Sequence, residues 1–429
     1  MEKILFPDKK NWEQLTQRPI AEKAMLQELV SNVFTEIKND GDKAVLKYSK
    51  SFDKVDMKTL LVEEEEINEA AKVLSTELKN AIQLAKANIE KFHAAQIEKS
   101  SVIETTSGVF CWRENRAIDK VGIYIPGGSA PLFSTVLMLG IPAKLGGCKE
   151  IILCTPPDAL GKINPAILYT AALVGITKIF CVGGIQAIAA MTFGTETIPS
   201  VYKLFGPGNQ YVTAAKQFAQ GFGVAIDMPA GPSEVLVIAD ETAEPSFVAA
   251  DLLSQAEHGT DSQVILLTID DKMLTETLEE IKKQLELLPR KDIAEKALKN
   301  SKAILLNNME ECISFSNSYS PEHLILAVKN AKRLVENITN AGSIFLGNYS
   351  CEAVGDYASG TNHTLPTNGY ARNYSGVSLD SFVKKITVQE LTIEGIKNIG
   401  PSVELLAEAE GLQAHKNAVT VRLERLKNN

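Results

Sequence analysis

Residues 150–182, EIILCTPPDALGKINPAILYTAALVGITKIFCV, contain two short apolar runs separated by a longer segment of helical length. The runs at 150–154 and 178–182 predict strands, and residues 164–174 predict the helix between them. Strands that alternate with helices of this length form a parallel sheet with crossover connections. This stretch therefore predicts an α/β fold.

The alternation continues on both sides of this stretch, and a Pro/Gly-rich break at residues 227–232 divides it into two α/β blocks, 121–232 and 233–346. Two amphipathic helices are expected before the blocks, one at 22–38 that stops at Gly41 and one at 63–92. Further expected strands lie at 121–125, 201–205, 234–239, 262–268, 303–306, 323–327, 342–346 and 382–388, and a last helix at 403–427.

Residues 347–377 are dense in Gly, Asn, Tyr, Ser and Thr and predict a long segment without regular structure. Such a segment is usually functional or disordered. It contains Asp356, Tyr357 and His363, which favours a functional loop over a mere linker.

The bulk properties of the chain exclude several classes of protein. Its 429 residues carry a net charge of −9, so nucleic acid and anionic membranes are not expected partners. No apolar run approaches the roughly 20 residues that span a bilayer, and no signal peptide is evident. Six cysteines without a C-x-x-C pair indicate free thiols and a cytoplasmic protein.

Residues 251–263, DLLSQAEHGTDSQ, place Gln255 and His258 three positions apart near the end of an expected helix. That spacing puts both side chains on one helical face. A carboxamide oxygen and an imidazole nitrogen there can begin a divalent metal site. The alternative is a polar helix end with no ligand role, and the pair alone does not decide between them.

Four of the five histidines fall in the second half of the chain, and three of them stand beside loop signals or other polar groups. His323 follows Glu322 at the mouth of a strand, His363 shares the polar segment with Asp356, and His415 stands five residues after Glu410. Such residues converge when they follow the carboxyl ends of strands in an open sheet. They predict either a metal or acid–base site at those ends, or four structural histidines; the fifth, His93, is expected to be an ordinary packing or surface residue.

The chain lacks the G-x-G-x-x-G fingerprint of dinucleotide-binding proteins. Residues 206–209, Gly-Pro-Gly-Asn, nevertheless follow an expected strand and open a helix, where a pyrophosphate could rest on the helix N-terminus. Gly127-Gly128-Ser129 is a second candidate. Tight turns that pack a helix on a strand are the alternative for both.

Six stretches closely resemble the histidinol dehydrogenase family, and the resemblance extends along essentially the whole chain. They are residues 121–146 (VGIYIPGGSAPLFSTVLMLGIPAKLG), 206–216 (GPGNQYVTAAK), 227–235 (DMPAGPSEV), 251–261 (DLLSQAEHGTD), 320–324 (SPEHL) and 342–364 (GSIFLGNYSCEAVGDYASGTNHT).

This resemblance implies oxidation of L-histidinol to histidinal and then to L-histidine, the last steps of histidine biosynthesis, with two NAD reduced. It implies a homodimer whose C-terminal segment crosses to the partner's active site, and one zinc ion per subunit. The implied catalytic pair is Glu322 and His323. The implied zinc ligands are Gln255, His258, Asp356 and His415; the implied substrate contacts are Ser233, Gln255, His258, His323, Asp356, His363, Glu410 and His415; the implied NAD contacts are Tyr124, Gln186 and Asn209.

The implied fold is two incomplete Rossmann-like parallel-sheet domains with a helical N-terminal and a small C-terminal extension. The expected division is an extension at 1–20, a metal and catalytic domain from 21–120 with 233–377, an NAD-binding domain at 121–232, and a C-terminal segment at 378–429. No cysteine is assigned a catalytic role, since most lie in apolar runs.

Two other functions would use similar residues. A zinc hydrolase also needs two histidines, an acid and a nearby glutamate, but it needs no nucleotide. A non-catalytic metal- or nucleotide-binding protein would bind without turnover, and the adjacent Glu322 and His323, a ready acid–base couple, argue against it.

Overall fold

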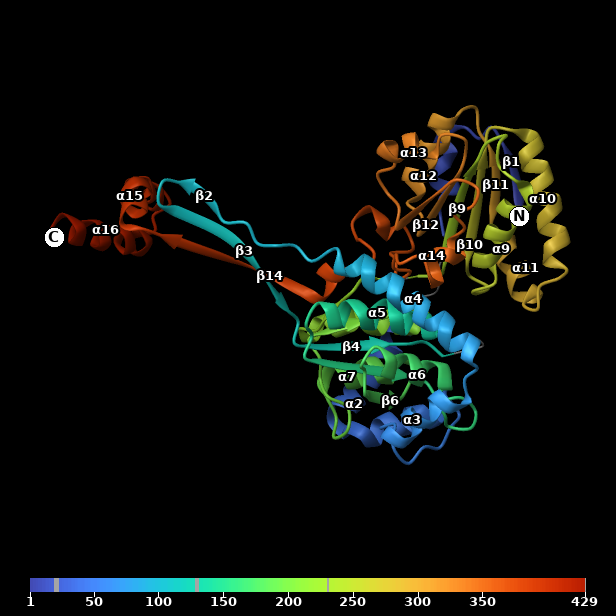
Figure 1. Ribbon diagram of the computed structural model, residues 1–429, viewed down its shortest axis with the longest axis horizontal. Helices are drawn as coiled ribbons and strands as arrows, with labels where there is room; N and C mark the ends of the chain where they lie inside the picture. The colour runs from blue at the N-terminus through green and yellow to red at the C-terminus, as the bar shows by residue number, and fades with distance from the viewer. Residues whose placement is uncertain (19–22, 128–130, 230, 429) are drawn as a thin grey trace. The chain divides into compact units, whose positions relative to one another are not determined.

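The computed structural model describes residues 1–18, 23–127, 131–229 and 231–428. It divides into two units, Met1–Gln96 with Ile118–Ser381, and Ile97–Ala117 with Phe382–Asn429. The first unit carries two parallel sheets flanked by helices, and the second carries a small antiparallel sheet (Figure 1). The predicted α/β class with two parallel-sheet domains is confirmed.

The first sheet has six parallel strands in the order β1-β11-β10-β9-β12-β13. Alternate residues of its strands face two separate cores, so helices cover both faces, and the central strands are apolar after their first residues. The strands are β1 (Glu2–Leu5), β9 (Glu234–Ala239), β10 (Gln263–Thr268), β11 (Lys302–Leu305), β12 (His323–Ala327) and β13 (Ser343–Leu346). One face packs against α9 (Pro245–Ala256), α10 (Asp271–Leu285) and α11 (Lys291–Lys299), the other against α1 (Trp12–Leu15), α12 (Met309–Tyr319) and α13 (Ala331–Leu334).

The second sheet has five parallel strands in the order β6-β5-β4-β7-β8. They are β4 (Lys120–Tyr124), β5 (Glu150–Thr155), β6 (Lys178–Cys181), β7 (Lys203–Phe205) and β8 (Ala225–Ile226). One core joins this sheet to α2 (Lys23–Phe52), α7 (Gly184–Phe193) and α8 (Gln210–Ala219). Helices α5 (Phe133–Leu145) and α6 (Pro165–Leu173) pack together, with α4 (Thr76–Ala94) on α5 and α3 (Glu64–Val73) on α6.

The N-terminal hundred residues do not follow the expected domain division. Strand β1 pairs with β11 and Trp12 is buried in the first sheet's core, so residues 1–18 are part of a domain and not an extension. The apolar stripe of α2, including Val33 and Ile37, is buried against α7 and the second sheet. Residues 23–60 therefore belong with 121–226 and not, as expected, with 233–377.

Several expected elements have different ends in the structure. The range of α2 contains two helices that meet at a kink at Gly41, whose φ of 53° and ψ of −134° are not helical, so the expected stop at Gly41 is confirmed. The helix expected at 63–92 is two helices, because Ser75 caps a new start by accepting a hydrogen bond of 3.1 Å from the backbone of Leu78. The loop expected at 347–377 contains a short helix, α14 (Glu352–Tyr357).

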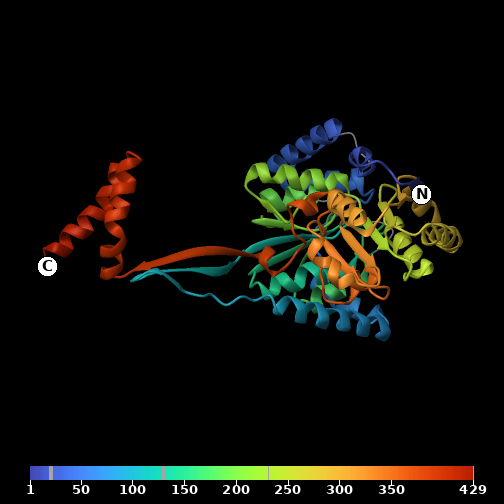
Figure 2. The ribbon, with the colours of Figure 1, turned by 90° about the horizontal axis from the view of Figure 1, so that it is seen from above.

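The second unit is built from two segments far apart in the sequence. Strands β2 (Ile103–Thr106) and β3 (Val109–Ala117) form an antiparallel sheet with β14 (Val383–Leu391), in the order β14-β3-β2. The final helix expected at 403–427 is two helices, α15 (Ile393–Ala409) and α16 (Gln413–Lys427), which pack on each other (Figure 2). Among the described residues, no helix has the length and apolar character needed to cross a membrane.

Candidate active site

The functional residues predicted in the first sheet gather at the edge where its strands begin. Glu234 and His323 are the first residues of the neighbouring strands β9 and β12. Helix α9 runs back against the strands, so its C-terminal end, with Gln255 and His258, returns to the same edge. The expectation of a site at the carboxyl ends of the strands is therefore wrong for this sheet, because its polar groups lie where strands start and a helix ends.

Three side chains at this edge form a candidate metal site. One ligand atom from each of His258, Glu352 and Asp356 lies within 4.8 Å of the other two. In addition, Oε1 of Gln255 is buried and has no hydrogen-bond partner among the described residues. A buried oxygen of this kind is available as a metal ligand. An imidazole nitrogen with carboxylate and carboxamide oxygens is a donor set suited to zinc.

Glu352 was missing from the residues predicted from the sequence. It lies four positions before Asp356 on α14, so both carboxylates project from one face of that helix. The sequence signal for Glu352 was its i, i+4 spacing from Asp356. This spacing was overlooked because residues 347–377 were expected to form an irregular loop. Glu352 is only 1% exposed, and burial raises the pKa of its carboxyl group to about 8.

Glu322 is buried at the first turn before β12, where its Oε2 accepts a hydrogen bond of 2.8 Å from the backbone N–H of Glu234. Burial raises the pKa of Glu322 to about 8. A carboxyl group in such a position exchanges protons near neutral pH, which suits general acid–base chemistry.

His323 is buried between two partners. Its Nδ1 lies 3.1 Å from the carbonyl oxygen of Glu234, which can only accept, so Nδ1 carries the proton of the neutral ring. Its Nε2 then points toward Asp356, 3.3 Å from Oδ1. Burial alone would lower the pKa of His323, but the carboxylates of Glu322 and Asp356 raise it to about 10. The same contact holds the pKa of Asp356 well below its usual range despite burial.

The structure also places His363 and Ser233 at this edge. Nδ1 of His363 donates to the backbone oxygen of Asp356 at 2.8 Å, and its Nε2 lies 3.0 Å from the hydroxyl of Thr135 on α5. Both ring nitrogens of His363 thus have protein partners. Ser233 directly precedes Glu234, and its carbonyl oxygen accepts from the backbone of Gln263 at 3.2 Å.

The remaining predicted ligands lie in the second unit. Glu410 ends α15 and His415 lies in the first turn of α16, and both side chains are exposed to solvent. The first unit therefore contributes Gln255, His258 and Asp356 of the four predicted zinc ligands.

The predicted NAD contacts lie in the second sheet, where the strand order reverses between β4 and β7. Such a switch point is where open α/β sheets bind ligands. Tyr124 ends β4, and its hydroxyl accepts a hydrogen bond of 3.1 Å from the backbone N–H of Gly184. Nearby on α7, Gln186 donates from Nε2 to Asp53 at 3.1 Å, while its buried Oε1 has no partner among the described residues.

The Gly-Pro-Gly-Asn turn follows β7 at the same switch point. Gly206 has φ +132°, and a Cβ there would collide with the carbonyl oxygen of Tyr124, so only glycine fits. Asn209 caps α8, its Oδ1 accepting from the backbone N–H groups of Tyr211 and Val212 at 3.1 and 3.2 Å. In the second candidate turn, Gly128 and Ser129 lie outside the described residues.

Known proteins resemble this chain over its full length. The family model named histidinol dehydrogenase matches residues 16–423. A histidinol dehydrogenase from Bacteroides fragilis is 58% identical over 427 residues, 100% of both chains, and one from Mannheimia succiniciproducens is 54% identical over 96% of each. The crystal structure of histidinol dehydrogenase from Elizabethkingia anophelis has a TM-score of 0.98 and 64% sequence identity, covering 100% of this chain and 99% of that one. The chain is therefore an oxidoreductase that belongs to the histidinol dehydrogenase family.

Proposed function

We propose that this enzyme oxidises L-histidinol to L-histidine by way of histidinal and reduces two molecules of NAD, completing histidine biosynthesis. The observation that carries this proposal is the buried pair of Glu322 and His323, with Nε2 of His323 3.3 Å from Oδ1 of Asp356. These contacts support an acid–base pair next to the side chains of the candidate metal site. The family named by the relatives supports the substrate.

His323 is the base for the alcohol. Its Nδ1–H is held by the carbonyl oxygen of Glu234, so the proton can be accepted only at Nε2. With Asp356 engaged as a metal ligand, its carboxylate would no longer hold a proton on Nε2 of His323, and Nε2 would be able to take the alcohol proton. The carbon that bears this hydroxyl group would give its hydride to bound NAD, and loss of the proton and the hydride together converts the alcohol to histidinal.

Glu322 serves the second oxidation. An aldehyde must add water before a second hydride can leave, and that water must lose a proton. The carboxylate of Glu322, next to His323, is placed to accept it. The hydrate then gives its hydride to the second NAD and a proton to the pair, and the carboxylate of histidine is formed.

The zinc ligands in our proposal are Gln255, His258 and Asp356 from one chain, joined by His415. Bound zinc supplies a positive charge that orients the amine and imidazole of the substrate. We place His415 and Glu410 in the active site of the second copy of a homodimer. The solvent exposure of both side chains supports this arrangement.

NAD is proposed to bind at the switch point of the second sheet, with Tyr124, Gln186 and Asn209 as its contacts. The buried Oε1 of Gln186 finds no donor in the part of the chain that the structure describes, which supports this position, since a buried acceptor without a donor is costly unless a ligand supplies one. The N-terminus of α8 offers backbone N–H groups for a pyrophosphate.

The test is a reaction of the zinc-loaded enzyme with L-histidinol and NAD, followed by the near-ultraviolet absorbance of NADH and by product analysis. We expect two NADH for each L-histidine formed. Binding of NAD or zinc without NADH would indicate a non-catalytic binding protein. A zinc hydrolase would give no NADH and would not need NAD.

A further inference from the structure

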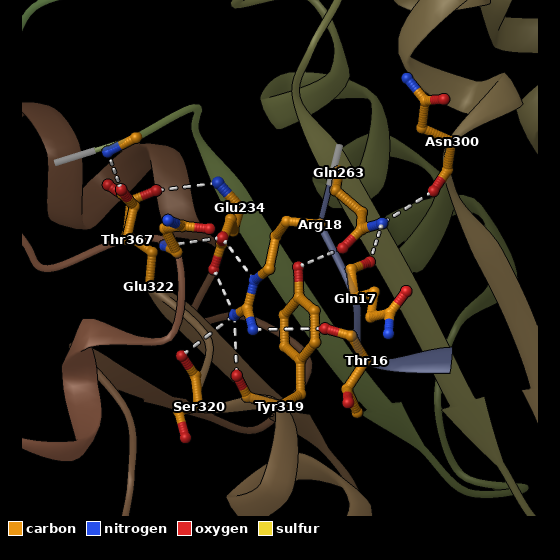
Figure 3. Close-up of polar contacts among 12 residues, drawn as sticks. Thr16, Gln17, Arg18, Glu234, Gln263, Asn300, Tyr319, Ser320, Glu322 and Thr367 are labelled. Atoms are coloured by element: carbon orange, nitrogen blue, oxygen red, sulfur yellow. Dashed lines mark hydrogen bonds and ion pairs between the residues drawn. The ribbon is translucent and has the colours of Figure 1, made fainter. Parts of the chain in front are cut away.

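The side chain of Arg18 lies among the starts of two strands, with only 11% of its surface exposed. Its Nε and Nη2 donate to the two carboxylate oxygens of Glu234, each at 2.9 Å, which is the paired geometry of a strong arginine–carboxylate contact (Figure 3). Its guanidinium also stacks on the ring of Tyr319, 3.8 Å from the ring centre. The planar group is thus held from several sides.

Glu234 holds both members of the proposed catalytic pair through its backbone. Its N–H donates to Oε2 of Glu322 at 2.8 Å, and its carbonyl oxygen lies 3.1 Å from Nδ1 of His323. Its carboxylate, 1% exposed, accepts from Arg18 and from the backbone N–H of Asn368 at 2.8 Å. The side-chain contacts of Glu234 therefore fix the peptide groups that orient Glu322 and His323.

Arg18 also holds the turn that leads into the catalytic pair. Nη2 donates to the carbonyl oxygen of Tyr319 at 2.7 Å, at the C-terminal end of α12, where a cation is favourable (Figure 3). The next residue, Ser320, has a left-handed φ of 58°, a costly conformation for a residue with a Cβ. Glu322 lies two residues after Ser320, directly before β12. One guanidinium thus joins the start of β9 to the turn before β12.

We propose that Arg18 and Glu234 are positioning residues for Glu322 and His323: the buried ion pair sets the place of the two backbone groups that hold the catalytic side chains. The proposal rests on the proposed function for the roles of Glu322 and His323. Neither Arg18 nor Glu234 exchanges protons with the substrate. Their contribution is geometric, and a misplacement of about 1 Å can reduce a rate about 100-fold.

The chain offers a matched control at the other end of the same strands. Asp240 directly follows β9, is 8% exposed, and accepts from the backbone N–H of Lys329, beyond β12, at 2.9 Å. It also accepts from the backbone N–H and the hydroxyl of Thr242. Asp240→Asn therefore disturbs a buried carboxylate between β9 and β12 at the edge opposite the catalytic pair.

The experiment compares the zinc-loaded full-length variants Arg18→Met, Arg18→Lys, Glu234→Gln and Asp240→Asn. We measure kcat for histidinol and for histidinal, KM for NAD, bound zinc and the melting temperature. Arg18→Met and Glu234→Gln are expected to lower kcat about 10- to 100-fold while KM for NAD and zinc content stay unchanged. Arg18→Lys keeps the charge but not the paired geometry, so it should recover part of kcat. Asp240→Asn should lower the melting temperature and leave kcat unchanged.

The inference is overturned if kcat falls no further in Arg18→Met and Glu234→Gln than in Asp240→Asn at a comparable loss of melting temperature. A fall of kcat in Asp240→Asn equal to that in Glu234→Gln also overturns the inference.

A second measurement does not depend on turnover. It follows the NMR resonance of the Nδ1–H proton of His323, which is assigned by its loss in His323→Gln. We expect the chemical shift of this proton to change in Glu234→Gln and to stay at its wild-type value in Asp240→Asn. An unchanged chemical shift in Glu234→Gln would contradict the inference. Absence of NADH from the wild-type enzyme would instead refute the proposed function.

Discussion

The hydroxyl of Ser254 donates a hydrogen bond of 2.5 Å to Oε2 of Glu352, which ties helix α9 to helix α14. The two helices carry the candidate metal site between them, since α9 leads to His258 and α14 bears Asp356. Glu352 is thus attached to one helix by its backbone and to the other by its side chain. In the proposed zinc site, its carboxylate would either ligate the metal or orient the groups that do.

Glu352→Gln should therefore weaken zinc binding about 10- to 100-fold, the range found when groups that support metal ligands are removed. The measurement is competition for zinc with a chelator of known affinity. Glu257→Gln is the control, because it makes the same chemical change next to His258 at a carboxyl group that does not belong to the metal group. Equal effects of the two substitutions would show that only net charge matters.

Glu322→Gln should impair the oxidation of histidinal more than the oxidation of histidinol. The amide still accepts the N–H of Glu234 through its oxygen, so the local fold is kept, but it cannot take a proton from water. Loss of a general base typically costs about 100-fold or more in rate. The measurement is the rate of NADH formation with histidinol and with histidinal separately. An equal loss of rate at both steps would contradict the role of Glu322 as the base that activates water.

His415→Asn should weaken zinc binding although His415 belongs to the second unit. If the residue serves the partner's site, a mixed dimer of His415→Asn with His258→Asn contains one intact site. Activity should then return when two inactive homodimers are unfolded, mixed and refolded together. A mixed dimer as inactive as its parents would exclude the exchanged arrangement.

The buried His93 should make stability fall in mild acid. Burial lowers its pKa below the ordinary value of 6.5, and it is 0% exposed, with Nδ1 2.9 Å from the carbonyl oxygen of Ile89. Below pH 6.5 the unfolded chain therefore binds a proton that the folded chain does not, and the free energy of unfolding decreases by up to about 1.4 kcal/mol per pH unit.

His93→Gln should remove this part of the pH dependence. At pH 8 the variant should be less stable than the wild type by about 1–2 kcal/mol, because the ring packing and its hydrogen bond are lost. Denaturant unfolding at several pH values from 5 to 8 measures both effects. Parallel curves for the two proteins would mean that His93 does not contribute to the acid dependence.

Cys351→Ser should leave kcat for both substrates within about twofold of the wild type. Cys351 adjoins Glu352 and is partly exposed, and in the first unit the other four cysteines are buried. Many aldehyde oxidations use a cysteine nucleophile, whereas in our proposal Glu322 and water take that part. A selective loss of histidinal oxidation in Cys351→Ser would favour the thiol route.

Much of the fold was predictable because burial imposes a pattern on the sequence. The strand–helix–strand order of residues 150–182 appears in the structure as β5, α6 and β6, since strands that are covered on both faces consist of short apolar runs. The helix at 352–357 was not predicted. Six residues are too few to show a helical repeat, and α14 is stabilised by packing on α9.

The sequence also did not show which elements the N-terminal helices pack against. The stripe of α2 shows that one face must be buried, but any apolar surface would satisfy it, and only the structure shows that α7 does. Likewise, β3 finds its antiparallel partner β14 more than 260 residues later along the chain. Pairings over such separations depend on how the intervening domains fold.

The sequence by itself determined the α/β class, the family and the residue types of the site, because apolar periodicity and long motifs are local properties of the chain. Only the tertiary structure decided which edge of the first sheet carries the candidate site, that Glu352 joins His258 and Asp356, and that Arg18 reaches Glu234. These contacts join residues distant in sequence, and their geometry follows from how strands and helices pack.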